Sequence, residues 1–239
     1  MKLIMIYRIL FFVILFGISG FSQLKNPETI LDKVKKEFEK IEDYQVDVKI
    51  KVDVDFLKMP DREATIFFKK PDKFQIDSEN FALLPKSGLN FSPLGFLNYN
   101  YTSFYVREDT INGTPTSVIK VIPLDGNADV ILSTLWIDVQ RNIILKVEST
   151  RKPQGTFFID MDYLKTIQGF WLPSVMAFSF TIDRGLFPGS SKTNKGSDTG
   201  KSKKNSDESE TGKVYLTYSN YKVNIGLSDK LFEDKNNKK

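Results

Sequence analysis

A strict alternation of apolar and charged residues between Val46 and Phe56 constrains the fold of this chain more than any other feature. The apolar set is Val46, Val48, Ile50, Val52, Val54 and Phe56, and the charged set is Asp47, Lys49, Lys51, Asp53 and Asp55. Successive side chains of a β-strand point to opposite faces, so the pattern predicts one strand with an apolar and a charged face. At about 3.3 Å per residue this strand is roughly 36 Å long. Such strands predict a broad, curved antiparallel sheet with a hydrophobic concave face.

The first 22 residues have the pattern of a secretory signal peptide. Lys2 and Arg8 supply the positive region, residues 9–18 form an apolar run, and Gly20 and Ser22 precede a predicted cleavage at Gln23. An uncleaved membrane anchor is the alternative, but the apolar run is shorter than the ~20 residues of a spanning helix. The sequence contains no Cys and therefore no lipobox. We expect a periplasmic protein without a lipid anchor.

Composition excludes several classes of function. Losing Lys2 and Arg8 with the signal peptide lowers the formal net charge from +4 to +2, which gives no reason to expect nucleic acid. Residues 23–239 are expected to form a single β domain. With no His and no Cys, the chain lacks His-based acid–base catalysis, Ser-His and Cys-His nucleophile pairs, and zinc sites built on these residues. We expect no catalytic residue, no metal and no cofactor.

Residues 27–42 are predicted to form an amphipathic helix. Asn26 can cap this helix and Pro27 suits its first position. The apolar residues recur at helical spacing, namely Ile30, Leu31, Val34, Phe38 and Ile41.

Further strands are predicted wherever apolar residues alternate between turn residues. The predicted strands are 62–70, 73–79, 104–109, 116–122, 131–139, 142–150, 155–163, 172–182 and 213–223. Lys70-Pro71-Asp72-Lys73 forms a tight turn between the first two of these strands, and short Gly- and Asn-containing turns join most of the others. Short turns predict an up-and-down antiparallel order.

Two segments depart from the strand pattern. Residues 80–97 are rich in large apolar side chains, yet Pro and Gly interrupt any long helix or strand. Because an exposed loop of this composition would promote aggregation, we expect a lid of short helical turns over the open side of the sheet. Residues 188–212 contain no apolar residue larger than proline and are predicted to be a disordered insertion between two paired strands.

The order of these elements resembles that of the LolA/LolB-like family of periplasmic lipoprotein carriers. Four local motifs carry the resemblance. They are the passage from Ile30-Leu31 to Tyr44-Gln45-Val46, the hairpin of residues 66–74 with its Lys-Pro turn, the hairpin of residues 135–138 and 145–148, and the tail 223–232. Together the motifs span nearly the whole chain after residue 22, apart from the insertion.

The resemblance implies an α+β, mainly β fold, in which an incomplete antiparallel β-barrel, an N-terminal helix and a helical lid enclose a hydrophobic cavity. It implies a monomeric carrier rather than an enzyme. Such carriers take acyl chains of lipoproteins from an inner-membrane lipoprotein-releasing transporter towards an outer-membrane acceptor. Many of them have Arg before the turn proline, where it holds the lid shut. Lys70 stands at that position here, and its single ammonium makes a weaker latch than a five-donor guanidinium.

A cavity of this kind would be lined by apolar side chains of the strands and the lid. The predicted set is Ile50, Val52, Val54, Ile66, Phe68, Phe74, Ile76, Leu84, Phe91, Leu94, Phe96, Leu97 and Trp136, with Lys70 as the lid latch. Packing in an ordinary core is an equal alternative for each strand residue, and core or edge packing is the alternative for Trp136. The carboxylates of Asp160 and Asp162 suit a solvated sheet face better than a hydrolase.

Two functions remain open at this level. The first is a periplasmic carrier that shields acyl chains of lipoproteins or other lipids. Burial of one CH₂ is worth about 0.8 kcal/mol, so a 16-carbon chain represents on the order of 10 kcal/mol, and a loosely packed apolar pocket can shield it yet release it. The second is an envelope sensor or interaction module of the same fold, with a filled concave face and a protein partner.

Overall fold

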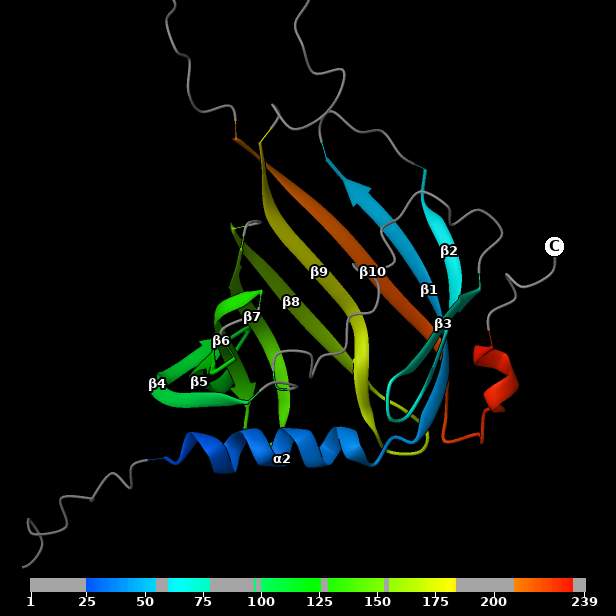
Figure 1. Cartoon of the computed structure of the whole chain (residues 1–239), viewed down its shortest axis with the longest axis horizontal. Helices are drawn as coiled ribbons and strands as arrows, with labels where there is room; N and C mark the ends of the chain where they lie inside the picture. The colour runs from blue at the N-terminus through cyan, green and yellow to red at the C-terminus, as the bar shows by residue number, and fades with distance from the viewer. Residues whose placement is uncertain are drawn as a thin grey trace, which may run out of the picture.

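All ten strands that the structure describes belong to one antiparallel sheet (Figure 1). The computed structural model describes residues 25–54, 60–77, 97, 100–125, 129–152, 155–183 and 209–233. In chain order the elements are α2 (Pro27–Glu39), β1 (Asp43–Asp53), β2 (Arg62–Lys69), β3 (Lys73–Asp77), β4 (Tyr101–Ile111), β5 (Thr114–Pro123), β6 (Val130–Asp138), β7 (Ile143–Arg151), β8 (Gly155–Lys165), β9 (Trp171–Asp183), β10 (Ser209–Val223) and the 3₁₀ helix η3 (Asp229–Phe232). The order across the sheet is β3-β2-β1-β10-β9-β8-β7-β6-β5-β4.

The chain builds this sheet from two meanders that meet where β1 pairs with β10. The pairing runs from Tyr44 opposite Val223 to Asp53 opposite Lys213. Strands β3 and β4 form the two edges, and within the described residues they do not pair with each other. The sheet is therefore an incomplete barrel, as predicted. The antiparallel order of successive strands is confirmed, whereas no local pattern predicted the β1–β10 pairing.

The ends of several elements differ from the predicted ones. The helix was expected to reach residue 42, but α2 ends at Glu39 because the chain turns there, with the N–H of Ile41 bonded to the carbonyl oxygen of Phe38 at 3.0 Å. Strand β1 begins at Asp43 instead of residue 46, and residues 55–56 lie outside the described residues. The remaining strands through β9 lie within three residues of their predicted bounds.

Strand β10 starts earlier than expected. Residues 209–212, which were assigned to the disordered insertion, form its first part and pair with β9. Backbone hydrogen bonds to a neighbouring strand need no apolar side chain, so composition alone placed this boundary wrongly. The rest of the predicted insertion lies outside the described residues, as does the predicted lid except for Leu97.

The alternation in β1 determines which of its side chains enter the core. Val46, Val48 and Ile50 are 0%, 2% and 2% exposed. Val46 lies opposite Ile66 of β2, and Ile50 lies opposite Leu216 of β10. Full burial of each such side chain contributes about 1.5–3 kcal/mol, which makes this face of β1 a major part of the core.

Helix α2 covers one end of the concave face (Figure 1). Its first turn is stabilised by Asn26, whose Oδ1 accepts a hydrogen bond from the N–H of Glu28 at 2.9 Å. Leu31 and Val34 are 0% and 4% exposed and belong to the same hydrophobic cluster as the inward residues of β1. Among the described residues, no helix is long and apolar enough to cross a membrane.

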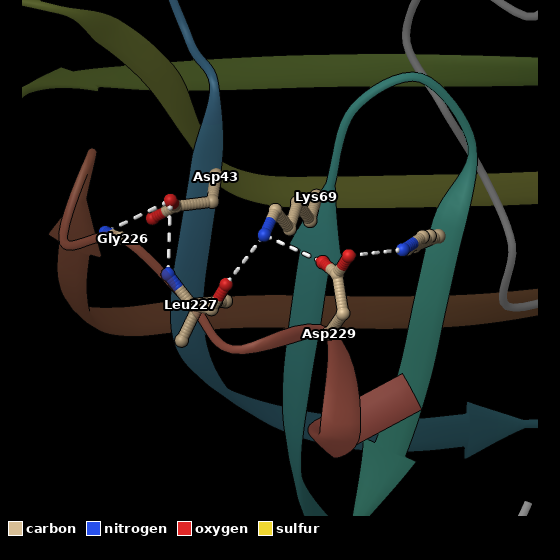
Figure 2. A network of polar contacts seen from close by, with 6 residues as sticks. Asp43, Lys69, Gly226, Leu227 and Asp229 are labelled. Carbon is tan, nitrogen blue, oxygen red and sulfur yellow. Dashed lines mark hydrogen bonds and ion pairs between the residues drawn. The ribbon is translucent and has the colours of Figure 1, made fainter. Parts of the chain in front are cut away.

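A polar network fastens the chain that follows β10 to the start of the sheet (Figure 2). We call Asp43, Lys69, Lys73 and Asp229 the C-terminal clasp. The Asp43 carboxylate is 3% exposed and accepts hydrogen bonds of 2.8–3.1 Å from the N–H groups of residues 225–227. Lys69 Nζ donates to the carbonyl oxygen of the last of these residues at 2.7 Å and pairs with Asp229 at 2.6 Å. The clasp thus connects β1, the β2–β3 hairpin and η3.

The same network changes the acidity of Asp229. The hydrogen bond from Lys69, followed by that from Lys73 at 3.0 Å, lowers the pKa of this carboxyl group. Asp229 is therefore ionised in the folded protein down to a lower pH than in the unfolded chain, so the ion pairs of the clasp persist at acidic pH where a free aspartate begins to be protonated.

The geometry of the clasp predicts that Asp43→Asn destabilises the protein by about 3 kcal/mol. The new amide NH₂ group would face backbone N–H donors in place of an acceptor oxygen. Urea unfolding measures the loss. Asp53→Asn, an exposed position on the same strand, is the control and should change the free energy of unfolding by about 0.5 kcal/mol or less. Equal losses for the two variants would contradict the role assigned to Asp43.

Candidate binding site on the concave face

Two neighbouring rows of side chains on the concave face differ in burial. One row of paired side chains crosses β1, β10 and β9 and is at most 2% exposed; it consists of Ile50, Leu216 and Met176. The next row along the same strands is only half-buried; it consists of Val52, Val214 and Phe178. Because α2 leads into the start of β1, the second row is the farther from the helix.

Aromatic side chains extend the half-buried row. Phe157 of β8 lies opposite Phe180 of β9 on the same face of the sheet, and both are half-buried. We call Val52, Val214, Phe178, Phe180 and Phe157 the open apolar area. Within the described part of the chain, these five apolar side chains adjoin the fully buried row and are more exposed than it.

The structure brings most of the predicted strand residues onto this concave face, at two levels of burial. Ile50, Val54 and Ile66 are buried in the interior at 2%, 8% and 3% exposure. Val52, Phe68, Phe74 and Ile76 are half-buried. Leu97 is 4% exposed and belongs to the main hydrophobic cluster, whereas Leu84, Phe91, Leu94 and Phe96 lie outside the described residues.

Trp136 does not join this set. Its neighbour Leu135 is fully buried in the hydrophobic cluster, so Trp136 points to the opposite, convex face of β6. There its Nε1 donates a hydrogen bond to Asp109 at 3.0 Å, and Lys146 Nζ lies 5.5 Å from the ring centroid. The prediction failed because residues 135–137 are apolar on both faces, and such a run does not reveal which face turns inward.

Lys70 contacts the end of α2. Its Nζ donates to the carbonyl oxygen of Glu39 and to Oε1 of Glu42, the latter at 3.0 Å. Carbonyl groups at a helix C-terminus attract cations, so this arrangement holds the β2–β3 turn against the helix. The predicted latch contact with residues 80–97 lies outside the described residues.

The buried tyrosines add no charge to the interior of the concave face. Burial raises the pKa values of Tyr44, Tyr163 and Tyr218, so their hydroxyl groups stay protonated at physiological pH. Tyr163 donates to the carbonyl oxygen of Ile144 at 2.8 Å.

In the described residues no cluster of His, Cys, Asp or Glu is arranged to hold a metal ion. Asp160 is exposed and lies 3.8 Å from Lys146 on the convex face.

Sequence reasoning missed the contributions of the later strands to the open apolar area. Phe157, Ile159 and Met161 occupy every second position of one segment, and Phe178 and Phe180 do so in another. The period of two was therefore visible in both segments. What the sequence could not show is that β10 brings these strands beside β1, because that pairing joins residues far apart in the chain.

Comparisons with known proteins identify the fold. No protein-family model matches the sequence, and no curated protein is significantly similar to it. Among solved structures, a Vibrio parahaemolyticus domain named for outer membrane lipoprotein sorting matches with a TM-score of 0.57 at 12% identity, covering 87% of this chain and 97% of that one. A LolA-superfamily protein of Nitrosomonas europaea matches with a TM-score of 0.54 at 13% identity, covering 88% and 98%.

A third solved structure, a DUF1329 family protein of Desulfovibrio piger, matches with a TM-score of 0.58 at 14% identity, covering 87% of this chain and 98% of that one. Similarity at this level of identity shows the fold. The chain therefore has a LolA-like fold, as its sequence motifs indicated, in the form of a curved, unclosed sheet with a helix at one end.

The change in burial along β1 predicts that truncating Val to Ala lowers the free energy of unfolding by different amounts at two positions. Val48→Ala removes a fully buried side chain and should lower the free energy of unfolding by about 2 kcal/mol. Val52→Ala, in the open apolar area, should cost about 1 kcal/mol or less in lipid-free protein. Urea unfolding of both variants measures the difference. A cost at Val52 equal to that at Val48 would mean that the area is filled.

Proposed function

We propose that this protein is a non-enzymatic carrier that shields acyl chains of lipoproteins or other lipids on its concave face. The open apolar area carries the proposal. It consists of aliphatic and aromatic side chains that face the same side as the core, yet α2 does not cover them. An acyl chain lying on this area would bury its own CH₂ groups and the half-buried side chains together.

The chemistry of the area suits a ligand that must be released. Its five members are Val52, Val214, Phe178, Phe180 and Phe157, none of which has a polar side chain. Hydrophobic contact is non-directional, so such a surface can accept chains of different lengths. It can also release them without breaking specific hydrogen bonds or ion pairs. No group of the described concave face requires a catalytic interpretation.

The proposed place of action is the bacterial periplasm. Residues 1–22 have the pattern of a cleaved signal peptide, and one structure of similar fold is named for outer membrane lipoprotein sorting. We extend the proposal to partners on that basis. An inner-membrane lipoprotein-releasing transporter would load the protein, an outer-membrane acceptor would unload it, and the protein would act as a monomer.

Native mass spectrometry of the chain tests the proposal directly. The protein, exported to a bacterial periplasm and purified without detergent, should carry extra mass that matches a fatty acid, phospholipid or lipopeptide. Extraction with organic solvent should remove that mass. A protein that is free of lipid and stays so when lipid is offered would contradict the proposal, and would favour a filled concave face and a protein partner.

A pair of adjacent substitutions on β1 locates the binding surface. Val52→Asn places an amide group in the open apolar area and should weaken binding of a fluorescent fatty-acyl probe about tenfold. Lys51→Asn changes the neighbouring, exposed residue on the other face and should leave the dissociation constant unchanged. Titration of lipid-free protein with the probe measures both. Equal effects of the two substitutions would place the acyl chain elsewhere.

A further inference from the structure

Arg151, the last residue of β7, places a cation beside the open apolar area. Val147 and Ser149 of the same strand face the concave side: Val147 belongs to the hydrophobic cluster, and the buried hydroxyl of Ser149 lies 2.9 Å from that of Ser133. Alternation along the strand puts Arg151 on the same side. Its guanidinium lies over the ring of Phe157, with 5.4 Å between Cζ and the ring centroid.

The guanidinium of Arg151 has no anionic partner within the described residues. Two other arginines differ in this respect, since Arg141 pairs with Asp138 at 2.5 Å and Arg107 pairs with Asp109 at 2.8 Å. Nε of Arg151 is buried and makes no hydrogen bond. A charged N–H group that has lost water and gained no acceptor costs free energy, which the cation–π contact with the aromatic ring offsets only in part.

Arg151 lies at the end of β7 away from α2. The helix approaches the start of this strand, where Val34 and Ile143 both line a small cavity of about 40 Å³. Arg151 follows Ile143 by eight residues, which corresponds to roughly 26 Å along the strand. In Figure 1 the β7–β8 hairpin end is on the side of the sheet opposite α2. The guanidinium of Arg151 therefore lies at the rim of the concave face and not in its middle.

We propose that Arg151 binds the anionic end of the acyl ligand, a carboxylate or a phosphate, while the chain lies on the open apolar area. This assignment rests on the proposed function. Among the lipids that such a carrier could bind, it favours those with an anionic end over uncharged acyl groups. The planar fork of a guanidinium can donate two parallel hydrogen bonds to either oxyanion.

The assignment is tested by the preference for a charged over an uncharged ligand of equal chain length. Lipid-free wild-type protein should bind palmitate about tenfold more tightly than hexadecanol, as measured by displacement of a fluorescent fatty-acyl probe. Arg151→Gln should abolish this preference and leave the affinity for hexadecanol unchanged. Arg151→Lys, which keeps the charge but not the fork, should retain part of it. Lys152→Gln, the neighbouring exposed cation, is the control and should retain all of it.

Different results contradict different claims. If the wild type binds palmitate and hexadecanol equally, or if Arg151→Gln keeps the preference, the role of Arg151 is overturned while the proposed carrier function stands. If neither ligand binds, both are overturned. Circular dichroism and urea unfolding establish that the Arg151 variants are folded, and binding of hexadecanol shows that their apolar area is intact.

A final comparison separates the sources of the oxyanion. Phosphatidic acid and diacylglycerol of matched chains are compared in the same assay, and inorganic phosphate is titrated alone. A preference for phosphatidic acid that depends on Arg151 identifies a phosphate headgroup, and one for palmitate alone identifies a carboxylate; either result supports the proposal. Inorganic phosphate that binds as tightly as the lipids, and only when Arg151 is present, would indicate a free-anion site and overturn it.

Discussion

The pairing of β1 with β10 is the interaction on which the rest of this structure depends. It joins a meander of three strands to a meander of seven, and only the combined sheet is wide enough to curve around a common interior. The register places Ile50 beside Leu216, so both inward faces belong to one hydrophobic cluster. Asp43 holds the chain immediately after β10 through three backbone N–H groups and secures the pairing at its end.

A mismatch of lengths connects this fold to its proposed function. Helix α2 has 13 residues and is about 20 Å long, whereas β10 has 15 residues and extends roughly 50 Å. One such helix, lying across one end of the sheet, cannot cover the whole concave face. The apolar pattern of the strands nevertheless continues beyond the covered end, to Val52 and Phe180. The sequence thus specifies more inward apolar surface than α2 can bury, and the proposed carrier function rests on that surplus.

Regular alternation made much of the fold predictable, and its interruptions limited the prediction. The helix, the strands and the inward face of β1 followed from their periods of 3.6 and 2. Register shifts such as that between Trp136 and Ile137 interrupt the alternation of side chains between the two faces. The face of one residue therefore does not predict the faces of residues beyond such a shift. The open apolar area was found only in part, because Val52 was visible on the first strand while Phe157 and Phe178 required the β1–β10 pairing. Arg151 gave no signal in the sequence, since an arginine at the end of a strand is ordinarily solvated.

The unpaired edges β3 and β4 have a mechanical consequence. In a closed barrel the number of strands and their shear fix the radius, and any change in girth requires hydrogen bonds between strands to break. This sheet has no hydrogen bonds between its two edges in the described residues, so its curvature can tighten or relax through small changes of twist distributed over all its strands. In this respect the open sheet is mechanically softer than a closed barrel. The concave face can therefore change its width without losing any of its backbone pairing.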